Sequence, residues 1–150
     1  MLALALAMLL RQNRTRLWTA FAILNLVLFA YELGDFFGAL LHAPTWGRLT
    51  LAAAGMIPAA ALGFLVEFQG DSAGRAVALR RIALGFGALT LATAFSPLAL
   101  VPAARVAAGG AACAQLIAAV SLLYARMRAA TSRTEHARLF YLWVGAALCV

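Results

Sequence analysis

The chain has 150 residues, of which 65% are hydrophobic and 11% are charged, and its formal net charge is +7. A soluble domain of this length could not bury so much apolar surface and still form a polar shell, so we expect a membrane protein. The positive charges lie in short gaps between apolar runs and form no basic patch with interleaved aromatic residues. The expected partners are therefore the lipid bilayer and its anionic headgroups, not nucleic acid.

Six apolar runs follow one another along the chain, and a helix needs about 20 such residues to cross a bilayer. The first run, 1–10, and the last run, 139–150, are too short to cross, so each is read as a partial span and the chain as a fragment of a longer protein. The composition predicts one all-α domain over residues 1–150, a polytopic membrane helix bundle of about five to six transmembrane helices. The four full spans are expected at 17–41, 49–68, 82–100 and 106–125.

All basic residues other than the two histidines are arginines, and they concentrate in every second gap between the runs. This distribution follows the positive-inside rule for multi-span proteins. It places the gaps at 11–16, 69–81 and 126–138 in the cytoplasm, the gaps at 42–48 and 101–105 outside, and the N-terminus outside. High alanine and arginine content without lysine indicates a bacterial genome rich in G and C, hence the bacterial inner membrane. The arginines that carry the pattern are Arg11, Arg14, Arg16, Arg48, Arg75, Arg80, Arg81, Arg105, Arg126, Arg128, Arg133 and Arg138.

An acidic pair near the outer end of the second span is the sharpest candidate site. Glu32 and Asp35 are three residues apart and share one helix face. They lie about 22 and 27 Å above the inner end of that span. With Tyr31 and Trp46 they could form an outward-facing pocket that binds a cationic or polar ligand, or that titrates.

Two other interpretations of the acidic pair stay open. The carboxylates could reach the headgroup layer, or they could pair with Arg48 or Arg105 on the same side. A metal or proton site is disfavoured because no histidine or third carboxylate lies at their depth. His42 and His136 fall on opposite sides of the membrane and cannot share a metal ion.

Three residues have expected structural roles inside the membrane. Asn25 and Gln115 lie at similar depths near mid-membrane, which makes a hydrogen bond between their helices possible. Pro58 lies within the third span and should kink it, freeing a carbonyl group near position 54. In a sensor such a kink is a possible hinge, and in any membrane protein it is a tolerated distortion.

The sequence shows no group of residues typical of a catalytic site. No nucleotide-binding glycine pattern, zinc-ligand spacing or catalytic triad is visible, and the titratable groups are scattered over both sides. Cys113 and Cys149 lie in apolar runs and behave as small hydrophobic residues. We therefore expect no catalytic residue, no metal and no cofactor in this segment, and do not expect it to be an enzyme.

Nearly the whole chain, from Leu9 to Val150, resembles the seven-transmembrane input region at the N-terminus of some bacterial sensor histidine kinases. The resemblance follows four segments in order: LLRQNRTRLW, AFAILNLVLFAYELGDFF, GMIPAAALGFLVEFQG and EHARLFYLWVGAAL. It implies a membrane region that senses, cytoplasmic domains that carry out the phosphorylation, and a homodimer. The chain stops within the sixth helix, so the seventh helix, the phosphoacceptor helix and the ATP-binding domain are not part of it.

Three functions are consistent with these features. The first is an integral membrane sensor module of a two-component signalling kinase, which passes a ligand or membrane signal to a cytoplasmic output domain. The second is a small accessory or structural subunit of a larger bacterial membrane complex. The third, a transporter or channel fragment, would need more intramembrane charge and an inverted repeat that the sequence does not show.

Overall fold

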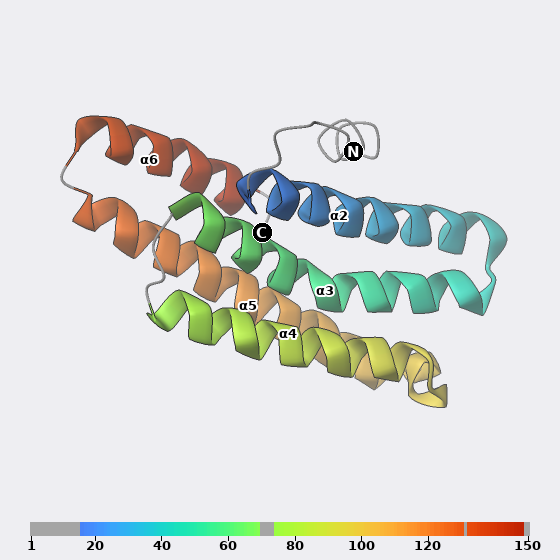
Figure 1. Cartoon of the computed structure of the whole chain (residues 1–150). Coiled ribbons are helices and arrows are strands. Elements are labelled where there is room, and N and C mark those ends of the chain that lie inside the picture. Colours follow the sequence, from blue (N-terminus) through green and yellow to red (C-terminus); the bar gives the residue numbers. More distant parts are fainter. Residues whose placement is uncertain (1–15, 70–73, 131, 149–150) are drawn as a thin grey trace.

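The computed structural model describes residues 16–69, 74–130 and 132–148, and within them the chain forms helices and no strand (Figure 1). The expected partial span at 1–10 lies outside the described residues. The elements in chain order are α2 (Arg16–Leu41), α3 (Pro44–Gln69), α4 (Gly74–Ala94), the 3₁₀ helix η1 (Pro97–Leu100), α5 (Pro102–Ala129) and α6 (Arg133–Leu148).

Four of these helices are long and apolar enough to cross a membrane: α2, α3, α4 and α5. A helix is one of the two structures that satisfy every backbone hydrogen bond without water, which is why apolar runs of this length fold this way in lipid. The predicted all-α membrane helix bundle is confirmed. The chain is a membrane protein.

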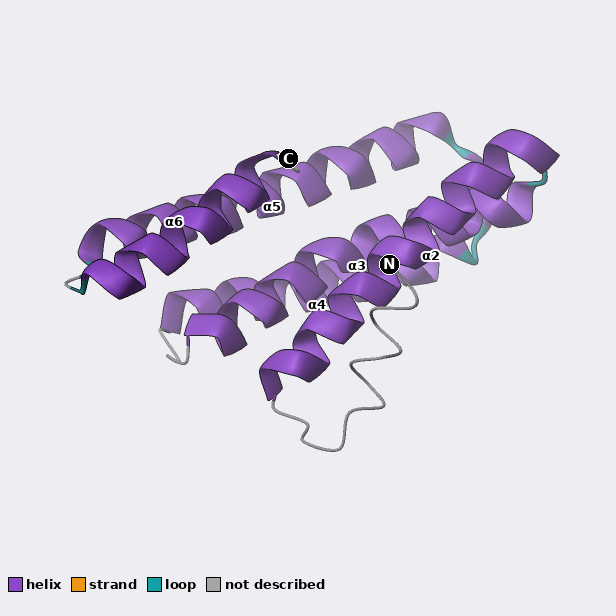
Figure 2. Cartoon of the chain, turned by 90° about the horizontal axis from the view of Figure 1, so that it is seen from above, coloured by secondary structure: helices purple, strands orange, loops and turns teal. Residues whose placement is uncertain are grey.

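Helix α3 is the centre of the bundle. It packs against α2, α4 and α5, whereas α6 packs against α5 and, among the described elements, α2 packs against α3 alone. Figure 2 shows α5 and α6 running side by side on one side of the group formed by α2, α3 and α4. Half of the α3 span is buried, against 17–22% of the other three spans.

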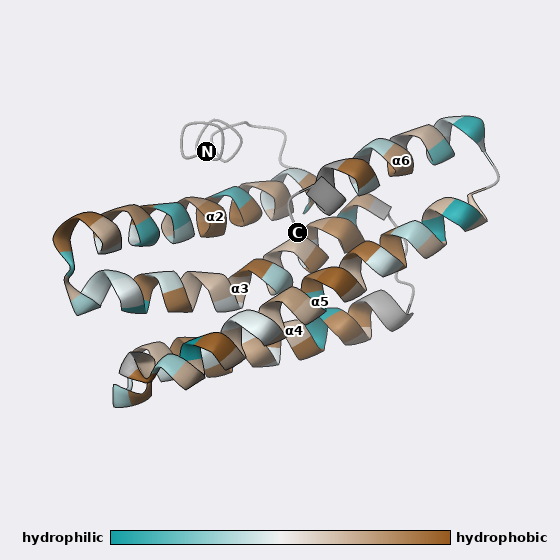
Figure 3. Ribbon diagram, turned by 180° about the vertical axis from the view of Figure 1, so that it is seen from behind, coloured by the Kyte–Doolittle hydropathy of each residue, from teal (hydrophilic) through white to brown (hydrophobic). Residues whose placement is uncertain are grey.

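The core is built mainly from small residues. Leu62 of α3 is only 2% exposed and packs with Ala59, Ala83 and Ala119, so α3, α4 and α5 meet at one cluster. Large apolar side chains such as Ile82 are exposed instead. Hydrophobic segments are found along every labelled helix of the ribbon in Figure 3. Lipid tails are as apolar as leucine, so a membrane bundle gains more from close helix packing than from hiding its large side chains.

Glycines bring α3 close to its two sequence neighbours. A Cβ at Gly55 would collide with the side chain of Thr90 on α4, and a Cβ at Gly34 of α2 would lie 2.7 Å from Oγ1 of Thr50. The hydroxyl of Thr90 is buried but bonded, since it donates to the carbonyl oxygen of Phe86 or Gly87 at 3.1 and 2.9 Å. Small residues thus set the spacing of the helices on both sides of α3.

The turns between the helices are shorter than the sequence predicted. The outer turn expected at 42–48 shrinks to two residues, because α3 begins at Pro44, and α4 begins at Gly74, inside the expected cytoplasmic loop at 69–81. The span expected at 82–100 ends as a helix at Ala94 and continues as η1, where the backbone N–H of Leu98 donates to the Oγ of Ser96 at 3.2 Å.

Prolines and arginines explain these differences. Proline is well placed in the first turn of a helix because its missing N–H would have no partner there. Arginine is a good helix former, so Arg48 and Arg105 extend the helices instead of ending them.

Pro58 is fully buried inside α3, which continues through it from Pro44 to Gln69.

We predict that Gly55→Ala destabilises the bundle. The new methyl group would overlap Thr90, and overpacking of this kind costs about 1–3 kcal/mol. Gly85→Ala on α4 is the matched control, because nothing lies within 4 Å of its added Cβ, and it should be neutral or slightly stabilising. Thermal unfolding in dodecyl maltoside, followed by circular dichroism, measures both. Equal midpoints for the two variants would show that this contact does not set the helix spacing.

Candidate functional site

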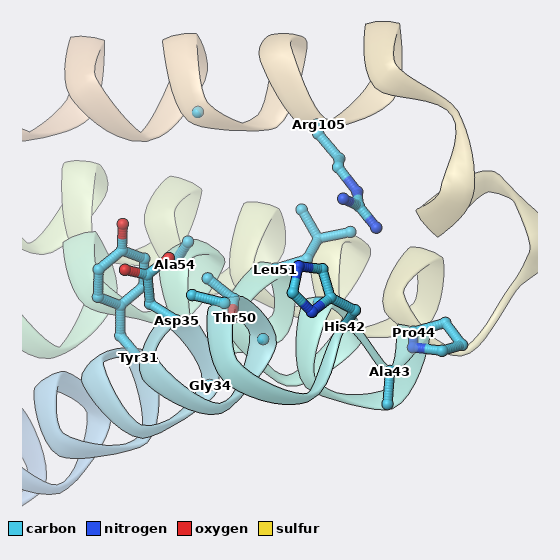
Figure 4. A pocket seen from close by; sticks show the side chains of 14 residues that line it. Tyr31, Gly34, Asp35, His42, Ala43, Pro44, Thr50, Leu51, Ala54 and Arg105 are labelled. Carbon is cyan, nitrogen blue, oxygen red and sulfur yellow. The ribbon is translucent and has the colours of Figure 1, made fainter.

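A cavity of about 600 Å³ opens at the end of the bundle where α2 turns into α3 and α5 begins. We call this end the cavity end. Its polar lining comes from three helices and one turn: Tyr31 and Asp35 on α2, His42 in the turn, Thr50 on α3 and Arg105 on α5 (Figure 4). Glycine, alanine, proline and leucine form the rest of the wall, including Gly34, Gly47 and Gly109.

The cavity exists because α2 and α5 both pack on α3 without contacting each other. Small residues widen the space between them: Gly34 and Gly38 face it from α2, and Gly47 and Ala54 from α3. A volume of this size lies in the range of small-molecule sites, which combine mostly apolar walls with a few convergent polar groups. The arrangement is therefore suited to binding.

His42 closes the α2 end of the cavity with an unusual backbone conformation. Its φ of 52° lies in the left-handed region, and its N–H donates to the carbonyl oxygen of Gly38 at 3.1 Å. This is the cap that glycine normally provides at the end of a helix. A residue with a side chain is strained there, yet the position turns the imidazole toward the cavity, on the side of Arg105 (Figure 4).

The side chain of Arg105 is held by η1. Its Nε–H donates to the carbonyl oxygen of Ala99 in η1 at 2.7 Å, and one terminal nitrogen lies 3.1 Å from where a Cβ of Gly47 would be. The 3₁₀ helix η1 thus positions the guanidinium over α3. Within the described residues no further hydrogen bond of this guanidinium is formed, so its terminal N–H groups face the cavity unpaired.

The acidic side of the cavity lies away from Arg105. Figure 4 shows Tyr31 and Asp35 beside each other at one end and His42 with Arg105 at the other, with Thr50 between them. Asp35 is exposed and forms no ion pair with any described residue. The cavity therefore has a negative end and a positive end.

The structure brings together only part of the predicted pocket. Tyr31 and Asp35 line the cavity, but Glu32 is exposed on α2 outside it. Trp46 is also outside, because α3 begins before it and its ring stacks on Phe37 of α2 at 4.7 Å between centroids. An i, i+3 spacing places two residues on one broad face without placing both in the same cavity.

The suggested pairing of the carboxylates with Arg48 or Arg105 is wrong for the described residues, where neither arginine forms an ion pair with Glu32 or Asp35. The Nε of Arg48 is buried without a hydrogen-bond partner. Lying on the same side of a membrane therefore does not by itself bring charges into contact. The sequence placed Arg105 on the same side of the membrane as the acidic pair but did not predict that it lines the pocket. No sequence feature predicted that His42 and Thr50 line it.

The hydrogen bond considered between Asn25 and Gln115 is also wrong. Asn25 is 4% exposed, and its Nδ2 donates to the carbonyl oxygen of Phe21 in its own helix at 2.9 Å. The Oε1 of Gln115 is buried without a hydrogen-bond partner. Their helices, α2 and α5, do not contact each other, so equal depth did not mean proximity.

The described residues hold no group of three or more His, Cys, Asp or Glu side chains that could bind a metal ion. The chain matches no protein-family model, no curated protein and no solved structure. The fold and the geometry of the cavity are thus the basis for a functional proposal.

We predict that His42→Gly stabilises the protein. Glycine adopts the left-handed conformation without the steric cost that other residues pay, so the gain should be about 1 kcal/mol. His42→Ala keeps the strained backbone and should give no such gain. Thermal unfolding of the two variants in the same detergent makes the comparison, and a stabilisation of His42→Ala equal to that of His42→Gly would contradict the backbone explanation.

Proposed function

We propose that this chain is the membrane-embedded input region of a bacterial sensor histidine kinase, acting in the inner membrane as a homodimer. The observation that carries the proposal is the cavity itself, lined by two helices, α2 and α5, that do not contact each other. A molecule bound there would link the two helices. The resemblance of the sequence to such input regions points to the same function.

The basic residues support an outward-facing cavity. Of the arginines in described helices, only Arg48 and Arg105 lie near the cavity end. The others lie in the halves of their helices toward the opposite end: Arg16, Arg75, Arg80, Arg81, Arg126, Arg128, Arg133 and Arg138. Under the positive-inside rule the opposite end faces the cytoplasm. An external ligand would then reach the cavity directly, and its effect would have to cross the bilayer.

Helix α5 is suited to carry that effect. It runs 28 residues without interruption from beside η1 to Ala129, which is about 42 Å. At its far end Leu123 and Met127 pack with Leu139 of α6, and the rings of Tyr124 and Trp143 lie 5.6 Å apart. A ligand that binds one position of α5 more tightly than another would shift α6 with it, and the shift can be no larger than that difference in affinity.

The test is phosphorylation of the whole native gene product in proteoliposomes with radiolabelled ATP. We expect label on a histidine. For Asp35→Asn and for Arg105→Gln we expect the rate of labelling to change by about fivefold or more, which is the lower range of allosteric coupling. Glu32→Gln, which removes a charge from the same helix outside the cavity, should behave as the unchanged protein. A gene product that takes up no label under any condition would end the kinase proposal.

A second candidate, an accessory subunit of a larger membrane complex, rests on a different observation. Gly85 and Gly110 are exposed, and nothing lies within 4 Å of a Cβ added to either of them. Small residues are typical of places where transmembrane helices approach closely. Such positions on the outside of a bundle would accept a helix of another protein.

For this candidate, we expect a tagged chain, solubilised from its native membrane in mild detergent, to retain a partner at fixed stoichiometry. Gly110→Leu should release the partner, because the side chain would block close approach. Ala125→Leu, also exposed on α5 but nearer its other end, should retain it. Purification of the unchanged chain alone would exclude this role.

A further inference from the structure

The cavity has opposite charges on two separate helices. Asp35 stands on α2, Arg105 stands on α5, and α3 keeps the two helices from meeting. Neither side chain has an ionic partner among the described residues. We propose that the cavity binds a compact zwitterion, with a primary ammonium group at Asp35 and an anionic group at Arg105. This deepens the proposed function, since it names the ligand class of the same site.

The positive end has the geometry of an anion site. The bond from the Nε of Arg105 to the carbonyl oxygen of Ala99 orients the guanidinium plane and leaves the terminal N–H groups for a ligand. Such a planar fork binds a carboxylate or a phosphate through two parallel hydrogen bonds. Gly47 keeps the approach open, because a side chain there would begin 3.1 Å from the guanidinium. His42 adds a second nitrogen-bearing side chain at this end.

The negative end offers acceptors to an ammonium group. Asp35 contributes a carboxylate, and Tyr31 beside it contributes a phenol oxygen. The hydroxyl of Thr50 donates to the carbonyl oxygen of Trp46 at 3.0 Å, so its proton is used and its oxygen remains as an acceptor. An ammonium group has three donors and no acceptor, which matches this set.

The spacing of the two ends favours a short ligand. Thr50 contacts Gly34, the neighbour of Asp35, and Gly47 contacts Arg105. The two contacts are three residues apart on α3, about 4.5 Å along the helix axis. Asp35 lies beyond Thr50 as seen from Arg105 (Figure 4), so a ligand must span more than this offset. A molecule with a few atoms between its ammonium and anionic groups gains further reach from the hydrogen bond that it forms at each end. Two sources share this chemistry: a free amino acid and the headgroup of a phosphatidylethanolamine lipid.

The experiment measures the thermal unfolding midpoint of the full chain in dodecyl maltoside. The probes are alanine and glycerophosphoethanolamine, with ethylammonium chloride and sodium acetate as probes that carry one charged group each. We expect at least one zwitterion to raise the midpoint saturably, and neither single-charge probe to do so at the same concentration. A response to glycerophosphoethanolamine alone assigns the site to the lipid headgroup, and a response to alanine alone assigns it to a free amino acid.

Variants tie the response to the two ends. Asp35→Asn and Arg105→Gln should each weaken the apparent affinity at least tenfold, while Glu32→Gln leaves it unchanged. Arg105→Lys keeps the positive charge but loses the planar pair of N–H donors. Its apparent affinity should lie between those of the unchanged chain and Arg105→Gln. Each variant is compared with its own ligand-free midpoint, so a general loss of stability does not count as lost binding.

The proposal is overturned if no zwitterion shifts the midpoint, if the single-charge probes shift it equally, or if both charge variants bind as the unchanged chain does. The measurement involves no kinase activity. The phosphorylation assay, in turn, requires no added ligand, so failure of the ligand class and failure of the kinase function give different results.

Discussion

The packing of small residues along α3 is the constraint on which the rest of the structure depends. In lipid, transmembrane helices gain little from hiding large apolar side chains, so they associate where backbones can approach closely. Gly55 against Thr90 fixes α4, Gly34 against Thr50 fixes α2, and Ala59 near Ala119 admits α5. Because all three neighbours use α3 as their common support, its position determines theirs.

This central position of α3 also creates the cavity. Three helices around a fourth cannot all touch each other, and here α2 contacts neither α4 nor α5, so a space is left between α2 and α5. At most levels the space beside a helix in a membrane is filled by lipid or by large side chains. At the cavity end the lining is instead glycine and alanine, with polar groups at its edges, so an open volume of about 600 Å³ remains.

The sequence predicted the helices, because they depend on hydropathy. It did not predict which helices pack against each other. The helices at 16–41 and 102–129 follow from apolar length, and the class of protein follows with them. The boundaries shifted because Pro44 and Pro102 start helices and arginines extend them, which local rules could have shown. The contacts between helices could not be predicted in this way. The depth of a residue along a span follows from its residue number, but the position of each helix around the bundle axis does not.

The candidate site illustrates the same limit. Asp35 was identified because an acidic residue inside a span is costly, and Tyr31 because it lies beside the acidic pair in sequence. Glu32 satisfied the same criterion and lies outside the cavity, since one residue of helix rotation is about 100°. Arg105 is 70 positions beyond Asp35 in the sequence. It belongs to the site because the carbonyl oxygen of Ala99 in η1 holds its side chain over α3.

The distance between the two charges is itself informative. Had Asp35 and Arg105 formed a direct ion pair, α2 and α5 would be tied together and the cavity between them would be closed. The fold instead holds Arg105 by its Nε and leaves its other donors toward the open volume. Two charges kept apart across a space can be joined only by a third group that carries both complements. In a bundle whose outer helices share one support, such a group would be a direct link between α2 and α5.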